Sequence, residues 1–219
     1  MNQNQQPKLK VCGLTRINQI HELISLKTDF LGFIFYEKSP RYVLNHLSSE
    51  DISHIDHNGK TGVFVNERID TIIDITEKAG LNLIQLHGDE NEDFVEQLRQ
   101  NLKPEIKIIK VIRIGNNDQK KRKKIEQIIN SHVSMVDYFL FDTDGTAFGG
   151  TGKQFDWTIL NEFEISLPYF LSGGISEENA KNIRLLYKLP FVIDINSKFE
   201  LEPGNKDLDK IRKFISKAF

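Results

Sequence analysis

The sequence predicts an α/β fold, a single-domain (β/α)8 barrel. Short β-rich apolar runs alternate with amphipathic or charged segments, and this strict alternation is typical of a parallel sheet covered by helices. Eight such units fit into 219 residues, near the lower end of the size range of these barrels. An open, doubly wound sheet is the second choice. Because no Pro/Ser-rich linker divides the chain, we expect one domain over 1–219, with 1–7 as a flexible tail.

The elements follow from the pattern of apolar residues along the chain. Continuous apolar runs predict strands over 8–12, 30–35, 61–65, 81–86, 106–112, 137–141, 168–172 and 190–195. The amphipathic or charged segments that follow them predict helices over 17–27, 48–56, 67–79, 91–102, 118–132, 156–163 (a shorter stretch), 176–187 and 206–218.

The composition excludes several classes of protein. Cys12 is the only cysteine, so neither an internal disulfide nor a cysteine-rich metal site can form, which fits a reducing compartment. The polar N-terminal segment shows no signal peptide, and no run reaches the roughly 18 apolar residues that a membrane span needs. A net charge of -2 gives no electrostatic reason to expect nucleic acid. We therefore expect a soluble cytoplasmic protein.

Polar or glycine-rich groups stand at the end of every predicted strand. In a barrel these ends meet at one rim, where active sites lie. Strand ends therefore supply the candidate site residues, and His87 is the one histidine among them. In chain order the groups are Cys12 with Gly13, Arg41, Asn66, His87 with Gly88, Arg113, Asp142, Ser172 with Gly173 and Gly174, and Asp194 with Asn196 and Ser197.

The loops after the last two predicted strands favour a phosphate ligand. Gly173 and Gly174 let the backbone approach a ligand closely, and Ser176 is a suitable N-cap for the next helix. Helix N-termini suit anions, and barrels often hold phosphate at these loops. A tight turn without a ligand explains the two glycines equally well. Asn196 and Ser197 add small polar donors and favour phosphate.

A further glycine-rich segment follows the sixth predicted strand. It fails the nucleotide P-loop pattern, because Ala147 stands where the first glycine belongs and Gln154 replaces the Ser/Thr that would bind magnesium. We expect a mobile lid instead, with a static surface loop as the alternative. The lid residues are Gly149, Gly150, Gly152 and Lys153, the last available to a negative ligand.

The basic run QKKRKK, residues 119–124, is interpreted as a solvated helix face. It is short, lacks interleaved aromatic residues and is balanced by acidic residues elsewhere, so we expect no nucleic-acid partner. No pair of histidines shows convincing metal-ligand spacing, so we expect no metal site.

Seven segments, in order and at similar spacing, resemble the phosphoribosylanthranilate isomerase family. They are KVCGLTR, GFIFYEKSPRYV, GVFVNE, IQLHGDE, LFDTDGTAFGGTGKQFDW, LSGGISEENA and IDINSKFELEPGNKD, and they span almost the whole chain. The resemblance implies a (β/α)8 barrel that converts N-(5'-phosphoribosyl)anthranilate into 1-(2-carboxyphenylamino)-1-deoxyribulose 5-phosphate. This is an Amadori rearrangement in tryptophan biosynthesis, and the family needs neither metal nor organic cofactor.

The resemblance also implies a role for individual residues. The general base falls on Cys12, the general acid on Asp142, and Arg41 matches the arginine that meets the anthranilate carboxylate. Asp194 matches an aspartate that lines the site. Lys198 departs from the pattern, since glycine is usual there: a positive φ would strain lysine by about 1–2 kcal/mol, or its ammonium attracts the phosphate. The phosphate cradle falls on Gly173, Gly174, Asn196 and Ser197.

The implied reaction needs one acid and one base on opposite sides of a bound sugar. Asp142 must hold its proton near neutral pH, which burial or nearby negative charge favours. Cys12 must act as a thiolate, and we expect helix N-termini at the rim and the developing iminium charge to favour that form. Without the resemblance, inert packing is the better explanation of a lone buried cysteine.

Two other functions stay open at this point. A related histidine-pathway or dual-substrate sugar-phosphate isomerase performs the same rearrangement, but it uses paired aspartates and phosphate-gripping loops in both halves of the chain. A non-catalytic protein that binds a phosphate ligand or nucleic acid would not depend on Cys12 or Asp142. We expect a small-molecule substrate, no membrane partner, and a monomer or homodimer.

Overall fold

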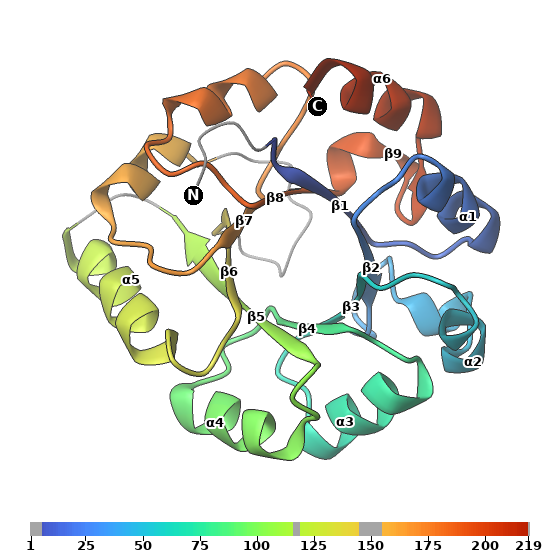
Figure 1. Ribbon diagram of the computed structural model, residues 1–219, viewed down its shortest axis with the longest axis horizontal. Helices are drawn as coiled ribbons and strands as arrows, with labels where there is room; N and C mark the ends of the chain where they lie inside the picture. Colours follow the sequence, from blue (N-terminus) through green and yellow to red (C-terminus); the bar gives the residue numbers. More distant parts are fainter. Residues whose placement is uncertain (1–5, 116–118, 145–154, 219) are drawn as a thin grey trace.

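A closed barrel of eight parallel strands forms the centre of the molecule. The computed structural model describes residues 6–115, 119–144 and 155–218. The strands pair in chain order and the first also pairs with the last, so they form the ring at the centre of Figure 1. The predicted (β/α)8 barrel is confirmed. The strands are β1 (Lys8–Cys12), β2 (Phe30–Ile34), β3 (Lys60–Phe64), β4 (Leu83–Leu86), β5 (Lys107–Ile114), β6 (Tyr138–Thr143), β7 (Tyr169–Leu171) and β8 (Val192–Ile195).

Helices surround this ring, as Figure 1 shows. The α-helices are α1 (Ile17–Ser25), α2 (Ser49–Ser53), α3 (Ile69–Lys78), α4 (Glu92–Asn101), α5 (Gln119–His132) and α6 (Leu208–Ala218). Short 3₁₀ segments complete the layer: η1 (Val43–Asn45), η2 (Trp157–Glu162), η3 (Ala180–Leu185) and η4 (Ser197–Phe199). The predicted flexible tail, 1–7, lies mostly outside the described residues and stays a prediction.

Two of the predicted helices, 156–163 and 176–187, are the 3₁₀ segments η2 and η3 rather than α-helices. The side chain of Asn161 ties them together: its Nδ2 donates to the carbonyl of Leu185 at 2.9 Å, and its Oδ1 accepts from the N–H of Tyr187 at 2.8 Å. A backbone N–H or C=O group that bonds to a side chain of a neighbouring segment is not available for the hydrogen bonds of a continuing helix. Both segments therefore stay short.

The N-cap predicted at Ser176 is wrong. The residue that precedes η3 is Asn179, and the N–H of Ser176 donates to the Asn179 side-chain oxygen at 2.8 Å. The backbone after the two glycines thus forms a turn held by an asparagine side chain. Any anion bound there meets loop N–H groups rather than the end of an α-helix.

A small hairpin between β8 and α6 is absent from the sequence prediction. It consists of β9 (Glu200–Glu202) and β10 (Asn205–Lys206), which pair antiparallel. Gly204 in its turn has φ +82°, in the left-handed region that glycine adopts readily. The hairpin places Glu200 and Lys206 beside the mouth of the barrel, where Glu200 forms ion pairs with Arg41 and Lys206.

The barrel interior is apolar at the N-terminal ends of the strands and polar toward the C-terminal ends. Side chains alternate along a strand, so residues two apart point to the same side. Val192 precedes Asp194 by two positions, and Leu140 precedes Asp142 in the same way. The first member of each pair is in the interior apolar cluster, and the second lines a pocket. The cluster consists of Phe30, Leu83, Ile109, Val111, Leu140, Phe170 and Val192.

Candidate active site

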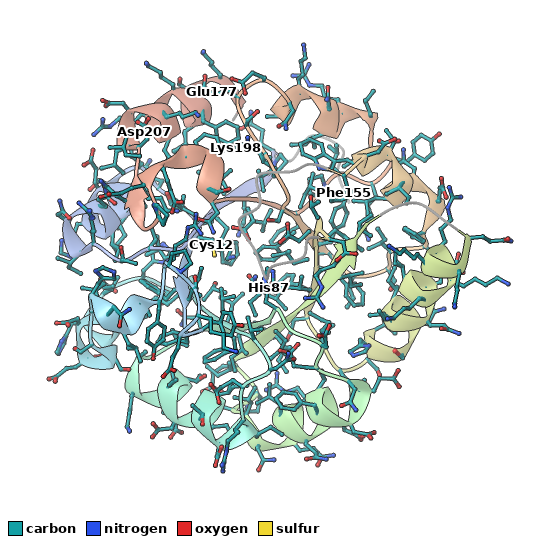
Figure 2. The ribbon with its side chains drawn as sticks, turned by 180° about the vertical axis from the view of Figure 1, so that it is seen from behind. Cys12, His87, Phe155, Glu177, Lys198 and Asp207 are labelled. Carbon is teal, nitrogen blue, oxygen red and sulfur yellow. The ribbon has the colours of Figure 1, made fainter. Side chains whose placement is uncertain are left out.

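One pocket opens at the C-terminal ends of the strands, and the predicted site residues gather around it. Figure 2 shows Cys12 and His87 near the centre of the ring, with Lys198 farther out. The apolar part of the wall includes Val63 and Ile34 at the ends of β3 and β2. The predicted residues that line the pocket are Cys12, Arg41, His87, Asp142, Gly173, Gly174, Asp194, Asn196, Ser197 and Lys198.

Two strand-end residues, Asn66 and Arg113, contact the loop after β4 instead. The N–H of Asn66 donates to Glu90 Oε1 at 2.9 Å, and its side-chain oxygen accepts from the N–H of Asp89 at 2.7 Å. Arg113 forms an ion pair with Asp89. Neither Asn66 nor Arg113 is among the residues that line the pocket. The predicted lid residues, Gly149, Gly150, Gly152 and Lys153, lie outside the described residues.

A buried lysine lies beneath the floor of the pocket. Lys10 is 0% exposed, and its Nζ donates to Asp194 Oδ2 at 2.7 Å and to Gln85 Oε1 at 2.8 Å. Burial by itself would lower the pKa of Lys10, but the charges of Asp194 and Cys12 outweigh it and raise the pKa above its ordinary value. Lys10 is therefore a permanent cation inside the barrel. Asp194 Oδ1 is buried and accepts no hydrogen bond from the described residues.

Cys12 lies two residues after Lys10 and points to the same side of β1. Burial raises the pKa of its thiol, while the positive charges of Lys10 and Lys206 act against that rise. Two buried ammonium groups thus favour the thiolate, and the expected contribution of helix N-termini stays a prediction. Gly32 on β2 leaves room for the sulfur, because a Cβ on Gly32 would lie 2.8 Å from Cys12 Sγ.

Asp142 lies across the pocket from this floor. Its Oδ1 accepts the backbone N–H of Thr143 at 2.8 Å, and its Oδ2 lies 3.4 Å from His87 Nε2. The other ring nitrogen of His87, Nδ1, lies 2.9 Å from Gln85 Nε2. Hydrogen bonds thus connect Lys10, Gln85 and His87 in a row, and His87 Nε2, which has no hydrogen-bond partner among the described residues, lies next to Asp142.

Arg41 is held in place by a buried carboxylate. Its Nε lies 2.9 Å from Glu200 Oε2 and its Nη2 lies 2.7 Å from the same oxygen. Lys206, whose side chain is 0% exposed, also contacts Glu200 at 2.7 Å. Burial would raise the pKa of Glu200, but Arg41 and Lys206 lower it below its ordinary value. Since Nε and Nη2 bind Glu200, the Nη1 end of the guanidinium is the part left for a ligand.

Replacing Glu200 by glutamine is expected to lower the free energy of unfolding by about 3 kcal/mol, because two buried cations lose their charged partner. Urea denaturation at neutral pH measures this. The lowered pKa means that Glu200 contributes its stability above its unfolded value of 4.5, and that the contribution is lost as the pH falls through the folded value. The difference between wild type and Glu200→Gln should therefore shrink in acid.

Glu202→Gln is the matched control on the same hairpin. Glu202 pairs with Arg16, but both side chains are largely exposed, at 63% and 47%. Exposed pairs of this kind contribute about 0–1 kcal/mol. Equal losses in the two variants, or a Glu200→Gln loss that persists in acid, would show that Glu200 acts by packing alone.

The glycine loop after β7 takes a conformation that requires glycine. Gly173 and Gly174 have φ values of +86° and +72°. A Cβ on Gly173 would lie 2.4 Å from Thr143 Oγ1 and 2.9 Å from the Thr143 nitrogen, so no side chain fits. Lys198 lies in η4 and is not among the described residues with positive φ. The strain considered for lysine at this position is therefore absent, and Lys198, an exposed residue, is among those that line the pocket.

Comparison with known sequences identifies the family. Residues 9–217 match the sequence profile described as N-(5'phosphoribosyl)anthranilate (PRA) isomerase.

The chain belongs to the phosphoribosylanthranilate isomerase family.

Individual members of the phosphoribosylanthranilate isomerase family match over nearly their full length. The N-(5'-phosphoribosyl)anthranilate isomerase of Parabacteroides distasonis is 37% identical over 210 residues, which are 94% of this chain and 91% of the relative. The solved isomerase of Thermotoga maritima has a TM-score of 0.77 at 30% identity, covering 97% of this chain and 98% of its own. A solved phosphoribosylanthranilate isomerase in complex with reduced 1-(o-carboxyphenylamino)-1-deoxyribulose 5-phosphate has a TM-score of 0.73 at 28% identity and the same coverage.

In this member of the phosphoribosylanthranilate isomerase family, sequence reasoning missed several polar and charged residues at and behind the pocket wall. Lys10 and Gln85 each stand two positions before a predicted site residue, Cys12 and His87, so the alternation of side chains along a strand places them on the same side. A charged or amide residue inside an otherwise apolar strand was the available signal. Glu200 and Lys206 gave none, because the hairpin that carries them was not predicted.

Two searches over the described ranges 6–115, 119–144 and 155–218 bear on other classes of site. No group of three or more His, Cys, Asp and Glu side chains there could hold a metal ion. No helix there is long and apolar enough to cross a membrane.

Proposed function

We propose that the chain catalyses the Amadori rearrangement of N-(5'-phosphoribosyl)anthranilate to 1-(2-carboxyphenylamino)-1-deoxyribulose 5-phosphate in tryptophan biosynthesis. One observation carries the proposal. In a member of this family, a buried thiol and a nearly buried carboxyl group, Cys12 and Asp142, face one pocket whose rim holds Arg41 and the glycine loop. This is an acid, a base and a binding group for each anionic end of the substrate.

The two ends of the substrate are bound on different sides of the pocket. The phosphate lies against the loop N–H groups of Gly173 and Gly174, with Asn196 and Ser197 beside it and Lys198 among the residues that line the pocket. The anthranilate carboxylate meets the free end of the Arg41 guanidinium, which Glu200 holds in place. Fixing both ends holds the ribose between Cys12 and Asp142.

The chemistry then proceeds in three steps. Asp142 gives its proton to the ring oxygen as the C1'–O bond breaks, and the nitrogen lone pair forms the C1'=N iminium ion. The Cys12 thiolate removes the C2' proton, and the C2'–H electrons form the C1'=C2' bond while the iminium electrons return to nitrogen. The resulting enolamine gains a proton at C1' and loses the C2' hydroxyl proton, which gives the ketone.

The productive enzyme carries a proton on Asp142 and none on Cys12. Burial raises the pKa of Cys12 above 9.0, so the resting thiol keeps its proton at neutral pH. When Cys12 and Asp142 hold one proton between them, a fixed fraction of the enzyme molecules carries that proton on Asp142. This fraction does not change with pH until the pair as a whole gains or loses a proton. We therefore expect kcat/KM to be flat through neutral pH and, on the alkaline side, to fall above the raised pKa of Cys12.

A pH profile of kcat/KM, set beside an ultraviolet titration of the thiolate in the free enzyme, measures this. Cys12 is the only cysteine, but the five tyrosines also absorb once ionised, so the thiolate signal is the difference between wild type and Cys12→Ser. The alkaline limb of the profile and the appearance of the thiolate should coincide. A thiolate already present at neutral pH, or a rate that rises steadily through neutral pH, would contradict the shared-proton arrangement.

The function itself is tested with the purified protein and N-(5'-phosphoribosyl)anthranilate, with the ketose product identified by chromatography. Conversion that survives a metal chelator is expected. No conversion would overturn the proposal. Turnover of the histidine-pathway aminoaldose phosphate in a parallel reaction would show a dual-substrate enzyme, and nucleic-acid binding without turnover would favour the non-catalytic alternative. The cytoplasmic location and the monomeric or homodimeric state stay predictions.

A further inference from the structure

The two ring nitrogens of His87 have different partners, and this difference carries information about its proton. Nδ1 lies 2.9 Å from Gln85 Nε2, within hydrogen-bond distance, whereas Nε2 is buried without a hydrogen-bond partner among the described residues and has Asp142 Oδ2 as its neighbour at 3.4 Å. Gln85 is 1% exposed, and its Oε1 lies 2.8 Å from the Lys10 ammonium.

The direction of each hydrogen bond in the row follows from what each group can do. A lysine ammonium only donates, so the Gln85 atom that faces Lys10 is the amide oxygen. The amide nitrogen then faces His87, and it also only donates. Nδ1 of His87 must accept with its lone pair, so the single proton of the neutral ring lies on Nε2, the nitrogen that is 3.4 Å from Asp142 Oδ2.

The position of this proton decides what His87 does to Asp142. With the proton on Nε2, His87 donates toward the carboxylate that Asp142 becomes after its own proton has gone to the ring oxygen, which stabilises that product of the transfer. With the proton on Nδ1, the lone pair of Nε2 would accept the proton of Asp142 and draw it away from the substrate. Only the first arrangement supports the acid step.

We propose that Lys10 and Gln85 select the Nε2–H tautomer of His87, and that His87 in this form is the positioning residue for proton transfer from Asp142. The tautomer assignment follows from the contacts alone. Its consequence for turnover rests on the proposed function.

Nitrogen-15 NMR of the histidine rings tests the tautomer directly, because protonated and unprotonated ring nitrogens give separate signals. The chain contains two references whose tautomers the backbone fixes. His57 Nε2 lies 2.9 Å from the Thr28 carbonyl, so it must carry the proton. His132 Nδ1 lies 3.0 Å from the Ile128 carbonyl, so that nitrogen must carry the proton, and burial lowers the pKa of His132 and keeps the ring neutral.

In wild-type enzyme at alkaline pH, where histidine is ordinarily neutral, we expect His87 to match His57 and to differ from His132. A His87→Gln variant assigns the signal. A His87 signal with the proton on Nδ1 would overturn the proposal. This measurement needs no turnover, so it decides the tautomer even if the isomerase assay fails.

Gln85→Glu tests the link to catalysis. A carboxylate at this position only accepts, so Nδ1 of His87 should become protonated while His57 and His132 stay unchanged. We expect kcat to fall by about 10²-fold, as for the loss of one donor to a developing charge, with KM changed by less than about threefold. A protonated Nδ1 with an unchanged kcat would overturn the positioning role, and an unprotonated Nδ1 would overturn the selection by Gln85.

Gln85→Met, which removes both hydrogen bonds without adding charge, covers the case in which Gln85→Glu does not fold. Both tautomers of His87 should then appear, and kcat should fall by about tenfold. A single Nε2–H signal and a wild-type kcat in this variant would show that the row of polar groups has no such role.

Discussion

Replacing Cys12 by serine is expected to lower kcat by about 10³-fold, which lies in the middle of the range that one general base contributes. Serine keeps the size and the place of the side chain against Gly32, so the pocket keeps its shape. Its hydroxyl is a far weaker base than a thiolate, and the C2' proton therefore stays on carbon. Steady-state rates give kcat, and calorimetry with the reduced product analogue gives the affinity, which should stay within a few-fold.

Thr76→Ser is a control for buried substitution at a distance from the pocket. Thr76 is 4% exposed on α3, and its hydroxyl donates to the Ile72 carbonyl at 2.6 Å, which serine can also do. Its kcat should equal that of wild type. If Cys12→Ser retained full activity, Cys12 would be a packing residue, as lone cysteines often are.

Asp142→Asn is expected to lower kcat by about 10³-fold as well, because an amide has no proton to give to the ring oxygen. The amide oxygen of the new side chain can still accept the N–H of Thr143, so the loop after β6 stays in place. Its amide nitrogen would face the Nε2 side of His87. The same rate and affinity measurements apply, together with a melting curve that separates a loss of chemistry from a loss of fold.

Asp144→Asn is the matched control for this change. Asp144 stands two positions further along, and its side chain is 45% exposed and lies 4.0 Å from Lys121. The same chemical substitution at this position should leave kcat within about twofold, since exposed pairs contribute little. Equal losses at 142 and 144 would point to a general effect of charge on this loop and would remove Asp142 from the acid step.

The barrel itself was predictable because each strand is buried on both faces and reads as a continuous apolar run. β1 was predicted to the residue, and the other strands differ by a few positions at their ends. The residues at the ends of β1, β6 and β8 were predictable as a group, because parallel strands deliver them to one rim. The hydrogen bonds and charge interactions around these residues were not predictable.

The unpredicted part of the site depends on contacts between distant parts of the chain. Nothing near Lys10 in sequence indicates that Asp194 and Gln85 meet its ammonium, and nothing near Arg41 indicates that Glu200 holds it. These partners determine the charge around Cys12 and the orientation of the guanidinium. That η2 and η3 are 3₁₀ segments rather than α-helices was unpredictable for the same reason. The side chain of Asn161 in η2 bonds to the backbone of Leu185 and Tyr187, at the end of η3 and just after it.

The ion pair between Lys10 and Asp194 also has a consequence for how the chain folds. Its members are 184 residues apart, and their strands form the seam where the first strand meets the last. On the ribosome, β1 has no neighbour on that edge until nearly the whole chain has been made, and contacts of such long range are slow to form. Two charges that would be costly to bury alone come together only at that step. The charged floor of the pocket is therefore completed when the ring closes, and a nascent chain that stops before β8 lacks both a closed ring and a site for substrate.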